Sequence, residues 1–305
     1  MLTFKQLEAV YWVVELGGFA QAAARLHTTQ SAVSKRVQEL ETLFDTPLFD
    51  RTQRAARLSD KGREMHQIAK TLLEQRNAAV ESFSRPDVIE RRLRVGVTEV
   101  AAMTWLPAFI AAVQATYPRV RIEAEADAMV PLREKLVAGD LDLAVVPVEM
   151  AEPRFATEVV GKVEMAWMCK PGLVTRRTMQ LDALTGHTFL VEGPRSGTGR
   201  IFHRWLKSVG VEPANTIVCS NLTAVVAMTV SGLGVSRLPR HCMQPLVDAG
   251  LLQPFKVAPQ APDVPYVAAY KKELRSTFNE AIVGLVQACC DFSRVFQTAA
   301  PKQRK

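Results

Sequence analysis

The stretch "TTQSAVSKRVQELE", residues 28–41, combines a polar start with an apolar stripe. Hydroxyl and amide side chains come first, and a basic pair follows them. Apolar residues recur at spacings of four and three, at Val33, Val37 and Leu40, which places them on one face of a helix. The pattern therefore predicts a helix with a polar first turn. That turn has two interpretations: an ordinary helix cap, or side chains exposed to read a binding partner.

Two shorter helices are predicted before this stretch. Thr3 can cap a helix that ends at Gly17-Gly18, and a second helix is predicted over 19–27. Three helices with such short connections are typical of the helix-turn-helix, in which the second helix of the motif lies in the DNA major groove. The apolar residues expected on the inner face are Ala23, Leu26, Val33, Val37 and Leu40.

The outer face of the third predicted helix carries side chains suited to DNA. Gln and Ser side chains bond base edges, and Lys and Arg reach guanine or phosphate. The next segment, 46–59, contains Arg51, Arg54 and Arg57 and predicts a small hairpin that contacts phosphates or the minor groove. Residues 1–60 hold equal numbers of cationic and anionic side chains, so binding would depend on where the cations lie. A helical unit with a merely solvated polar face remains the alternative.

A long amphipathic helix is predicted over 59–85, with Ser59 as its cap. Its apolar positions step by four and three residues, which favours a helix that pairs with a second copy. The alternative is a helix that packs on its own domain. The residues along this stripe are Met65, Ala69, Leu72, Arg76, Ala79 and Phe83.

From residue 92 onward the pattern changes to alternating strands and helices. The segments "RLRVGVT", "RVRIEAEA" and "LDLAVVPV" read as strands separated by helices, the first of them interrupted near Pro107. This βαβαβ order predicts an α/β domain with right-handed crossovers. Further strands and helices follow, including a last helix over 272–297, and they suffice for two small α/β lobes.

Three predicted strand-to-helix junctions carry small polar residues: Thr98, the segment "RSGTGR" at 195–200, and "CSN" at 219–221. Helix N-termini attract anions, and ligands of open parallel sheets lie beyond the strand ends. Taken singly, each junction is better explained as an ordinary helix cap. Glu99 would repel an anionic ligand, so we expect it to start its own helix and favour that helix dipole; otherwise it could select a ligand that carries an amine.

The bulk composition fits a globular protein of 305 residues with a net charge of +7. The five cysteines show no metal-type spacing, and no nucleophile with a base is recognisable. We therefore predict no catalytic residue, no metal and no cofactor. No signal peptide or membrane-spanning run is visible in the sequence, so we expect a cytoplasmic protein without a membrane partner.

Residues 4–62 resemble the N-terminal domain of LysR-type transcriptional regulators. They contain "F-x-x-L", "GGF-x-x-AA-x-x-L", "T-Q-S-A-V-S-x-x-V-x-x-LE", "PLF-x-R" and "LS-x-x-G". The resemblance implies a winged helix-turn-helix with a long linker helix, then a two-lobed α/β effector domain similar to periplasmic binding proteins. The implied divisions are 1–58 for DNA binding, 59–91 for the linker or dimerisation helix and hinge, 92–163 plus 265–300 for lobe I, 164–264 for lobe II, and 301–305 for a basic tail.

The resemblance also implies partners: double-stranded promoter DNA with dyad symmetry, a small-molecule inducer in the cleft, RNA polymerase, and other copies in a homodimer or homotetramer. The implied function is an effector-responsive regulator that activates transcription. The alternative is a solute-binding or enzymatic α/β protein that uses its N-terminal helices only for oligomerisation. The predicted DNA-binding residues are Thr29, Gln30, Ser31, Ser34, Lys35, Arg36, Gln38, Arg51 and Arg54. The predicted effector-binding residues are Thr98, Glu99, Ser196, Gly197, Thr198 and Asn221.

Overall fold

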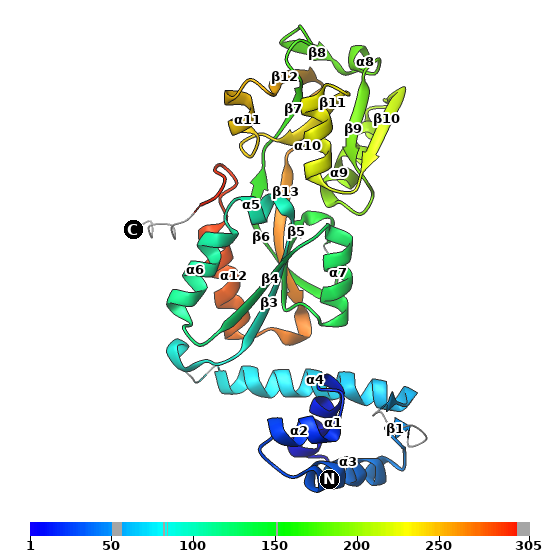
Figure 1. Ribbon diagram of the computed structural model, residues 1–305, viewed down its shortest axis with the longest axis vertical. Helices are drawn as coiled ribbons and strands as arrows, with labels where there is room; N and C mark the ends of the chain where they lie inside the picture. The colour runs from blue at the N-terminus through cyan, green and yellow to red at the C-terminus, as the bar shows by residue number, and fades with distance from the viewer. Residues whose placement is uncertain (51–56, 82, 84, 151, 298–305) are drawn as a thin grey trace. The chain divides into compact units, whose positions relative to one another are not determined.

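The computed structural model describes residues 1–50, 57–81, 83, 85–150 and 152–297. The chain forms two compact units, Met1–Phe83 and Ser84–Lys305, which are described separately (Figure 1). The elements of the first unit are α1 (Phe4–Glu15), α2 (Phe19–Arg25), α3 (Gln30–Phe44), β1 (Phe49–Asp50), β2 (Arg57–Leu58) and α4 (Asp60–Glu81).

The caps and the core of the three-helix unit follow the sequence pattern. Thr3 and Gln6 form a reciprocal capping box at the start of α1. The predicted inner face is confirmed, since Ala23, Val33, Val37 and Leu40 are buried and Leu26 packs against them. The third helix begins at Gln30 rather than at residue 28, because Thr29 is its cap.

Strands β1 and β2 pair antiparallel, which confirms a hairpin after α3. Arg51 and Arg54 lie outside the described residues, so their predicted contacts stay predictions. A close approach fixes the base of the hairpin: a Cβ on Gly62 would lie 2.0 Å from the Leu48 carbonyl oxygen. Only glycine fits there, which gives a physical reason for the "LS-x-x-G" pattern.

Ser59 joins the hairpin to α4. Its Oγ donates to the Pro47 carbonyl at 2.7 Å and accepts from the Gly62 N–H at 2.9 Å. The first bond holds the segment that leads into β1. The second is the predicted N-cap bond of α4. One hydroxyl therefore fixes where the long helix starts relative to the hairpin.

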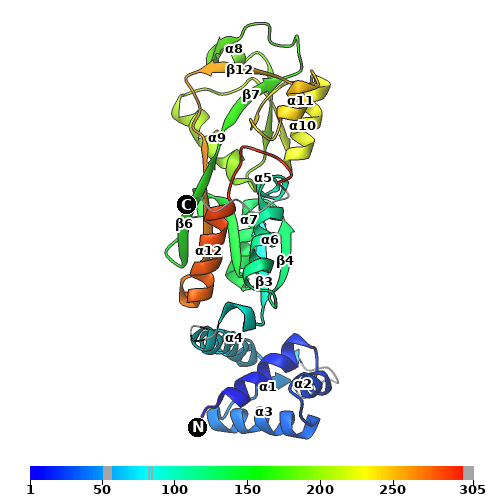
Figure 2. The same ribbon diagram turned by 90° about the vertical axis from the view of Figure 1, so that its left-hand side faces the viewer.

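Helix α4 packs along α1, and this divides the predicted apolar stripe (Figure 2). Ala69 is buried against Leu7, and Arg76 donates to Glu8 at 2.7 Å. The prediction that the whole stripe faces a second copy is therefore wrong for this part, which packs on its own domain. Farther along, Ala79 and Phe83 are exposed. The stripe changes its role along its length because α1 covers only part of α4.

The second unit begins with the 3-10 helix η1 (Pro86–Val88) and contains two sheets. The first sheet has the order β4-β3-β5-β13-β6, in which β3 pairs parallel with β4 and β5 while β13 runs antiparallel. This confirms the predicted βαβαβ order. We call this sheet and its helices lobe I: β3 (Arg92–Val97), α5 (Glu99–Met103), α6 (Leu106–Thr116), β4 (Arg121–Ala126), α7 (Met129–Ala138), β5 (Leu143–Pro147), η2 (Val148–Met150), β6 (Phe155–Val163), β13 (Val264–Lys271), η3 (Lys272–Leu274) and α12 (Thr277–Cys289).

Two predicted helices of lobe I are divided in the structure. The interruption near Pro107 is confirmed, because α5 ends and α6 starts with Pro107 in its first turn, where the missing N–H costs nothing. The single helix predicted over 272–297 is wrong. Ser276 accepts from the Asn279 N–H and starts α12 there, so η3 is a separate short turn.

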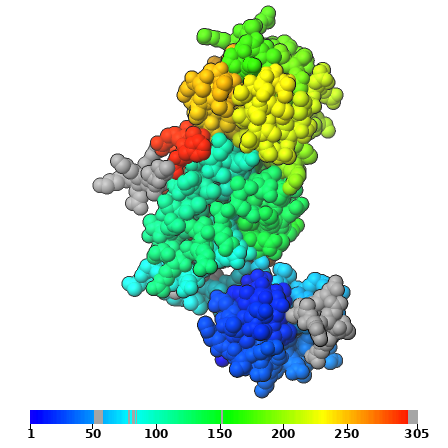
Figure 3. All heavy atoms as spheres, in the orientation of Figure 1, coloured from blue at the N-terminus to red at the C-terminus, as the bar shows by residue number. Residues whose placement is uncertain are grey.

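The second sheet has the order β10-β9-β11-β7-β12-β8, with β9 parallel to β10 and β11, and β7 antiparallel to β11 and β12. On the face shown in Figure 3, the atoms of the two lobes meet without an open groove between them. We call this sheet and its helices lobe II: β7 (Met165–Cys169), β8 (Thr178–Gln180), α8 (Leu181–Leu184), β9 (Thr188–Glu192), α9 (Gly197–Ser208), β10 (Asn215–Cys219), α10 (Leu222–Ser231), β11 (Val235–Pro239), α11 (Gln244–Asp248) and β12 (Gln253–Ala258).

The chain crosses between the lobes twice, from β6 to β7 and from β12 to β13. Asp263 lies on the second crossing and contacts the first. Its carboxylate accepts from the Met165 N–H at 3.4 Å and lies 3.3 Å from the Lys162 Nζ. The two crossings are therefore linked side by side.

Candidate functional site

The polar start of α3 serves as a cap and also leaves side chains exposed. Thr29 Oγ1 accepts from the Ala32 N–H at 3.2 Å and lies 3.0 Å from the Ser31 hydroxyl. The cap interpretation is thus confirmed for Thr29. Gln30, Ser31, Lys35 and Gln38 are exposed, and Ser34 and Arg36 are half-buried.

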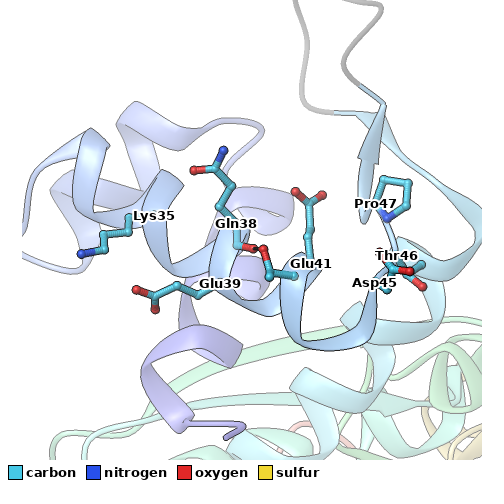
Figure 4. A pocket seen from close by; sticks show the side chains of 8 residues that line it. Lys35, Gln38, Glu39, Glu41, Asp45, Thr46 and Pro47 are labelled. Carbon is cyan, nitrogen blue, oxygen red and sulfur yellow. Dashed lines mark hydrogen bonds between the residues drawn. The ribbon is translucent and has the colours of Figure 1, made fainter.

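The C-terminal half of α3 borders an acidic groove of about 690 Å³. Figure 4 shows Lys35 and Pro47 at opposite ends of this groove. Glu41 accepts from the Leu48 N–H at 2.7 Å, so it positions the segment before β1. Carboxylates repel phosphate, so this groove disfavours a DNA backbone beside the C-terminal half of the helix. The groove is lined by Lys35, Gln38, Glu39, Glu41, Thr42, Asp45, Thr46 and Pro47.

The second unit contains a cavity of about 130 Å³ between the two lobes. The helix starts of α5 and α7 from lobe I and of α9 and α10 from lobe II converge on it. The structure thus brings together the three junctions that the sequence singled out, although they lie far apart along the chain. All six predicted residues line the cavity: Thr98, Glu99, Ser196, Gly197, Thr198 and Asn221.

The junction residues differ in what their side chains do. Asn221 Oδ1 accepts from the Ala224 N–H at 2.8 Å, and Ser196 Oγ accepts from the Gly199 N–H at 3.3 Å. These two are helix caps, as the simpler interpretation held. Thr98 makes no cap bond, and its Oγ1 lies 2.9 Å from the Tyr266 hydroxyl.

Glu99 lies at the start of α5, but its carboxylate serves another helix. Its Oε2 accepts from the Leu222 N–H at 2.8 Å, at the first residue of α10 in the other lobe. Glu99 starts α5 as expected, and its carboxylate also bonds to the N-terminus of a second helix, α10. A negative charge is favourable at a helix N-terminus, and the carboxylate does lie at one.

Three titratable residues that line the cavity were not predicted from the sequence: Asp127, Glu192 and Tyr266. Asp127 and Glu192 each follow or end a strand, so the strand-end rule that selected Thr98 could have found them. Tyr266 lies inside the apolar run of β13 and gave no such signal. Burial, with a smaller contribution from Glu99, raises the pKa of the Glu192 carboxyl to about 7.

The two lobes are also bonded beside the cavity. The Val130 N–H donates to the Arg195 carbonyl at 3.1 Å. Arg204 of α9 forms two parallel bonds to Glu149 of η2, at 2.7 and 2.5 Å. Paired bonds of this kind fix orientation as well as distance. The lobes are therefore joined by both a backbone bond and a side-chain ion pair.

Comparison with known families decides the identity of the chain. A model described as a bacterial regulatory helix-turn-helix protein of the lysR family matches residues 4–63, and a model of the LysR substrate binding domain matches residues 86–290. The chain belongs to the LysR family of transcriptional regulators. The family consists of regulators rather than enzymes. Within the described part of this LysR-type regulator, no helix is long and apolar enough to cross a membrane.

Curated LysR-type relatives resemble the chain over most of its length. The regulator MetR of Escherichia coli K12 is 22% identical over 285 residues, which cover 93% of this chain and 89% of MetR. The regulator CzcR of Bacillus anthracis is 24% identical over 250 residues, which cover 82% of this chain and 84% of CzcR.

Solved structures share the fold. A full-length cysteine variant of OxyR from Pseudomonas aeruginosa matches with a TM-score of 0.72 at 20% identity, covering 97% of this chain and 98% of that one. Full-length BenM matches with a TM-score of 0.57 at 19% identity, covering 94% of this chain and 96% of that one. This LysR-type regulator therefore has the winged helix-turn-helix, linker helix and two-lobed α/β effector domain of its family.

Proposed function

We propose that this LysR-type regulator binds dyad-symmetric promoter DNA through the N-terminal half of α3. The observation that carries the proposal is the row of exposed polar side chains in front of a buried apolar stripe. Such side chains contact bases, and a rigid helix behind them sets their positions. The proposed base or groove readers are Gln30, Ser31, Ser34 and Lys35. The proposed backbone contacts are Thr29, Arg36, Arg51 and Arg54, and Gln38 completes the predicted set.

A second copy would supply the dyad symmetry. Part of α4 and the residues after it leave apolar side chains exposed: Ile68, Val80 and Phe83 are 44%, 62% and 94% exposed. Apolar side chains along one helix favour helix pairing. Two copies joined through α4 would present two α3 helices to two half-sites. The family-typical homotetramer would join two such dimers.

The proposal includes a small-molecule inducer in the cavity between the lobes. A ligand there touches both lobes and changes the balance of the contacts that join them, such as Arg204 with Glu149. A ligand shifts such a balance only by its differential affinity for the two arrangements. The change would reach RNA polymerase through the packing of the subunits, and the regulator would act in the cytoplasm, as an activator.

The alternative is a solute-binding or enzymatic protein whose N-terminal helices only oligomerise. That role does not need Gln30, Lys35 and Gln38 exposed ahead of a buried stripe. A test on DNA separates the two hypotheses.

Selection from a pool of random DNA duplexes with the full-length chain tests the function. We expect enrichment of one dyad-symmetric sequence with half-sites separated by about one helical turn or a multiple of it. Sequencing of the bound fraction measures it. Recovery of fragments without any shared sequence, at affinities that depend only on salt, would contradict specific promoter binding.

Replacing Thr98 by valine is expected to weaken the inducer response by about fivefold while operator affinity stays unchanged, since one buried hydrogen bond contributes about 1 kcal/mol. The valine keeps the shape of Thr98 but leaves the Tyr266 hydroxyl without this partner. The readout is the change in operator affinity when an extract of bacterial metabolites is added. Thr223→Val, on an exposed residue of α10, is the matched control. A normal response of the Thr98 variant would remove Thr98 from the site.

A further inference from the structure

The cavity between the lobes has an unusual charge. Three carboxylates line it, from Glu99, Asp127 and Glu192. No lysine, arginine or histidine is among its lining residues, all of which the structure describes. An anionic ligand would meet only like charge from these side chains, and charges of one sign repel strongly inside a protein.

At two of the four helix N-termini around the cavity, those of α9 and α10, N–H groups are already bonded to oxygens of the protein. At α10, the Leu222 N–H bonds to the Glu99 carboxylate and the Ala224 N–H bonds to Asn221. At α9, the Gly199 N–H bonds to the Ser196 hydroxyl. Such N–H groups are what normally attract an anion to a helix start. Here the chain itself supplies the negative group at α10.

Glu192 has no cation to compensate it among the described residues. Burial is the main cause that raises the pKa of its carboxyl to about 7; hydrogen bonding from Ser196 opposes the rise, and the nearby Glu99 charge adds to it. Arg237 shares a neighbouring cavity of about 20 Å³ with Glu192. Its guanidinium is buried, donates to the Pro262 carbonyl instead, and leaves Nη1 without a partner in the described part of the chain.

The size of the cavity limits the ligand. About 130 Å³ is close to the roughly 150 Å³ cavity that binds benzene in an engineered protein. The ligand part held between the lobes is therefore a small group, comparable to a short aliphatic chain with one polar head.

We infer that the effector of this regulator carries a positively charged nitrogen group, of the ammonium or amidinium class, which bonds to Glu192 and Glu99 in the cavity between the lobes. The inference rests on the proposed function, since it names the chemical class of ligand for the proposed effector site. A cation with N–H donors would use the free lone pairs of both carboxylates and remove their mutual repulsion.

Three probes of equal shape test the inference: butyramidinium, butyramide and butyrate have the same number of non-hydrogen atoms and differ in charge. Thermal unfolding and calorimetric titration of the full-length chain measure their binding. We expect butyramidinium to stabilise the protein, butyramide to act weakly, and butyrate to have no effect. Glu192→Gln should weaken butyramidinium binding at least about tenfold, as expected for a lost bond between charged groups.

Glu212→Gln is the matched control, because it removes the same charge from an exposed residue of lobe II. Stabilisation by butyrate but not by butyramidinium would overturn the cation preference and leave the cavity as an effector site. Equal weakening by Glu192→Gln and Glu212→Gln would also overturn it. If none of the three probes binds, both the inference and the effector role of the cavity fail, while DNA binding is judged separately by the duplex selection.

Discussion

Replacing Lys35 by glutamate is expected to reduce operator affinity by about a hundredfold or more, because like charges placed together at an interface cost several kcal/mol. Lys35 is exposed on the N-terminal half of α3, where it can reach guanine or phosphate. In the proposed dimer, the variant would place a negative charge against the DNA in each subunit. Operator affinity is measured by fluorescence anisotropy at fixed salt, with the DNA sequence obtained from the selection.

The fold should survive this change, since surface substitutions usually alter stability by less than about 0.5 kcal/mol. Circular dichroism and the unfolding midpoint check that point. Lys5→Glu is the matched control, because it makes the same charge change on an exposed residue of α1 in the same unit. Unchanged affinity of the Lys35 variant, or an equal loss in both variants, would show that α3 does not read the operator. Ser34→Ala should also lose specific binding.

Replacing Glu192 by glutamine is expected to abolish a pH dependence of stability. The pKa of Glu192 is about 7 in the folded chain, against an ordinary value of 4.5. Below pH 4.5 the carboxyl is protonated in both states. Between pH 4.5 and about 7 the carboxyl is ionised in the unfolded state but still protonated in the folded state. The free energy of unfolding therefore falls over this range, by at most about 3 kcal/mol. Because Glu192 keeps some exposed surface, we expect less than this limit.

Urea unfolding of the full chain at about pH 5 and about pH 8, followed by tryptophan fluorescence, measures the effect. Trp105, Trp167 and Trp205 lie in the second unit and report on it. The parent should lose more stability between the two values than the glutamine variant, and Glu212→Gln should behave like the parent. An equal loss in the parent and in the Glu192 variant would contradict the raised pKa.

The first unit was predictable to a large extent because its signals are local. The cap at Thr29 and the buried stripe of Val33, Val37 and Leu40 depend only on neighbouring residues in one helix. The division of the α4 stripe was not predictable. Periodicity shows that one face of a helix is apolar, but it does not show whether α1 or another chain covers that face.

The cavity was predictable in its helix starts and not in its chemistry. Thr98, Ser196 and Asn221 follow strands, and the strand-end rule places such residues together. The bond from Glu99 to the Leu222 N–H joins residues of different lobes, so no local pattern contains it. Tyr266 enters from the middle of a buried strand, where sequence indicates only core.

The linked crossings between the lobes have a mechanical consequence. Because Asp263 bonds to the neighbouring crossing at the Met165 N–H, two backbone segments move as a pair. Two linked segments resist twisting and sliding more than bending, so we expect the easiest relative motion of the lobes to be a change in the angle between them. Hinge motions of this kind are carried by a few residues at element ends. A ligand that enters between the lobes would therefore change mainly one quantity, the angle between them.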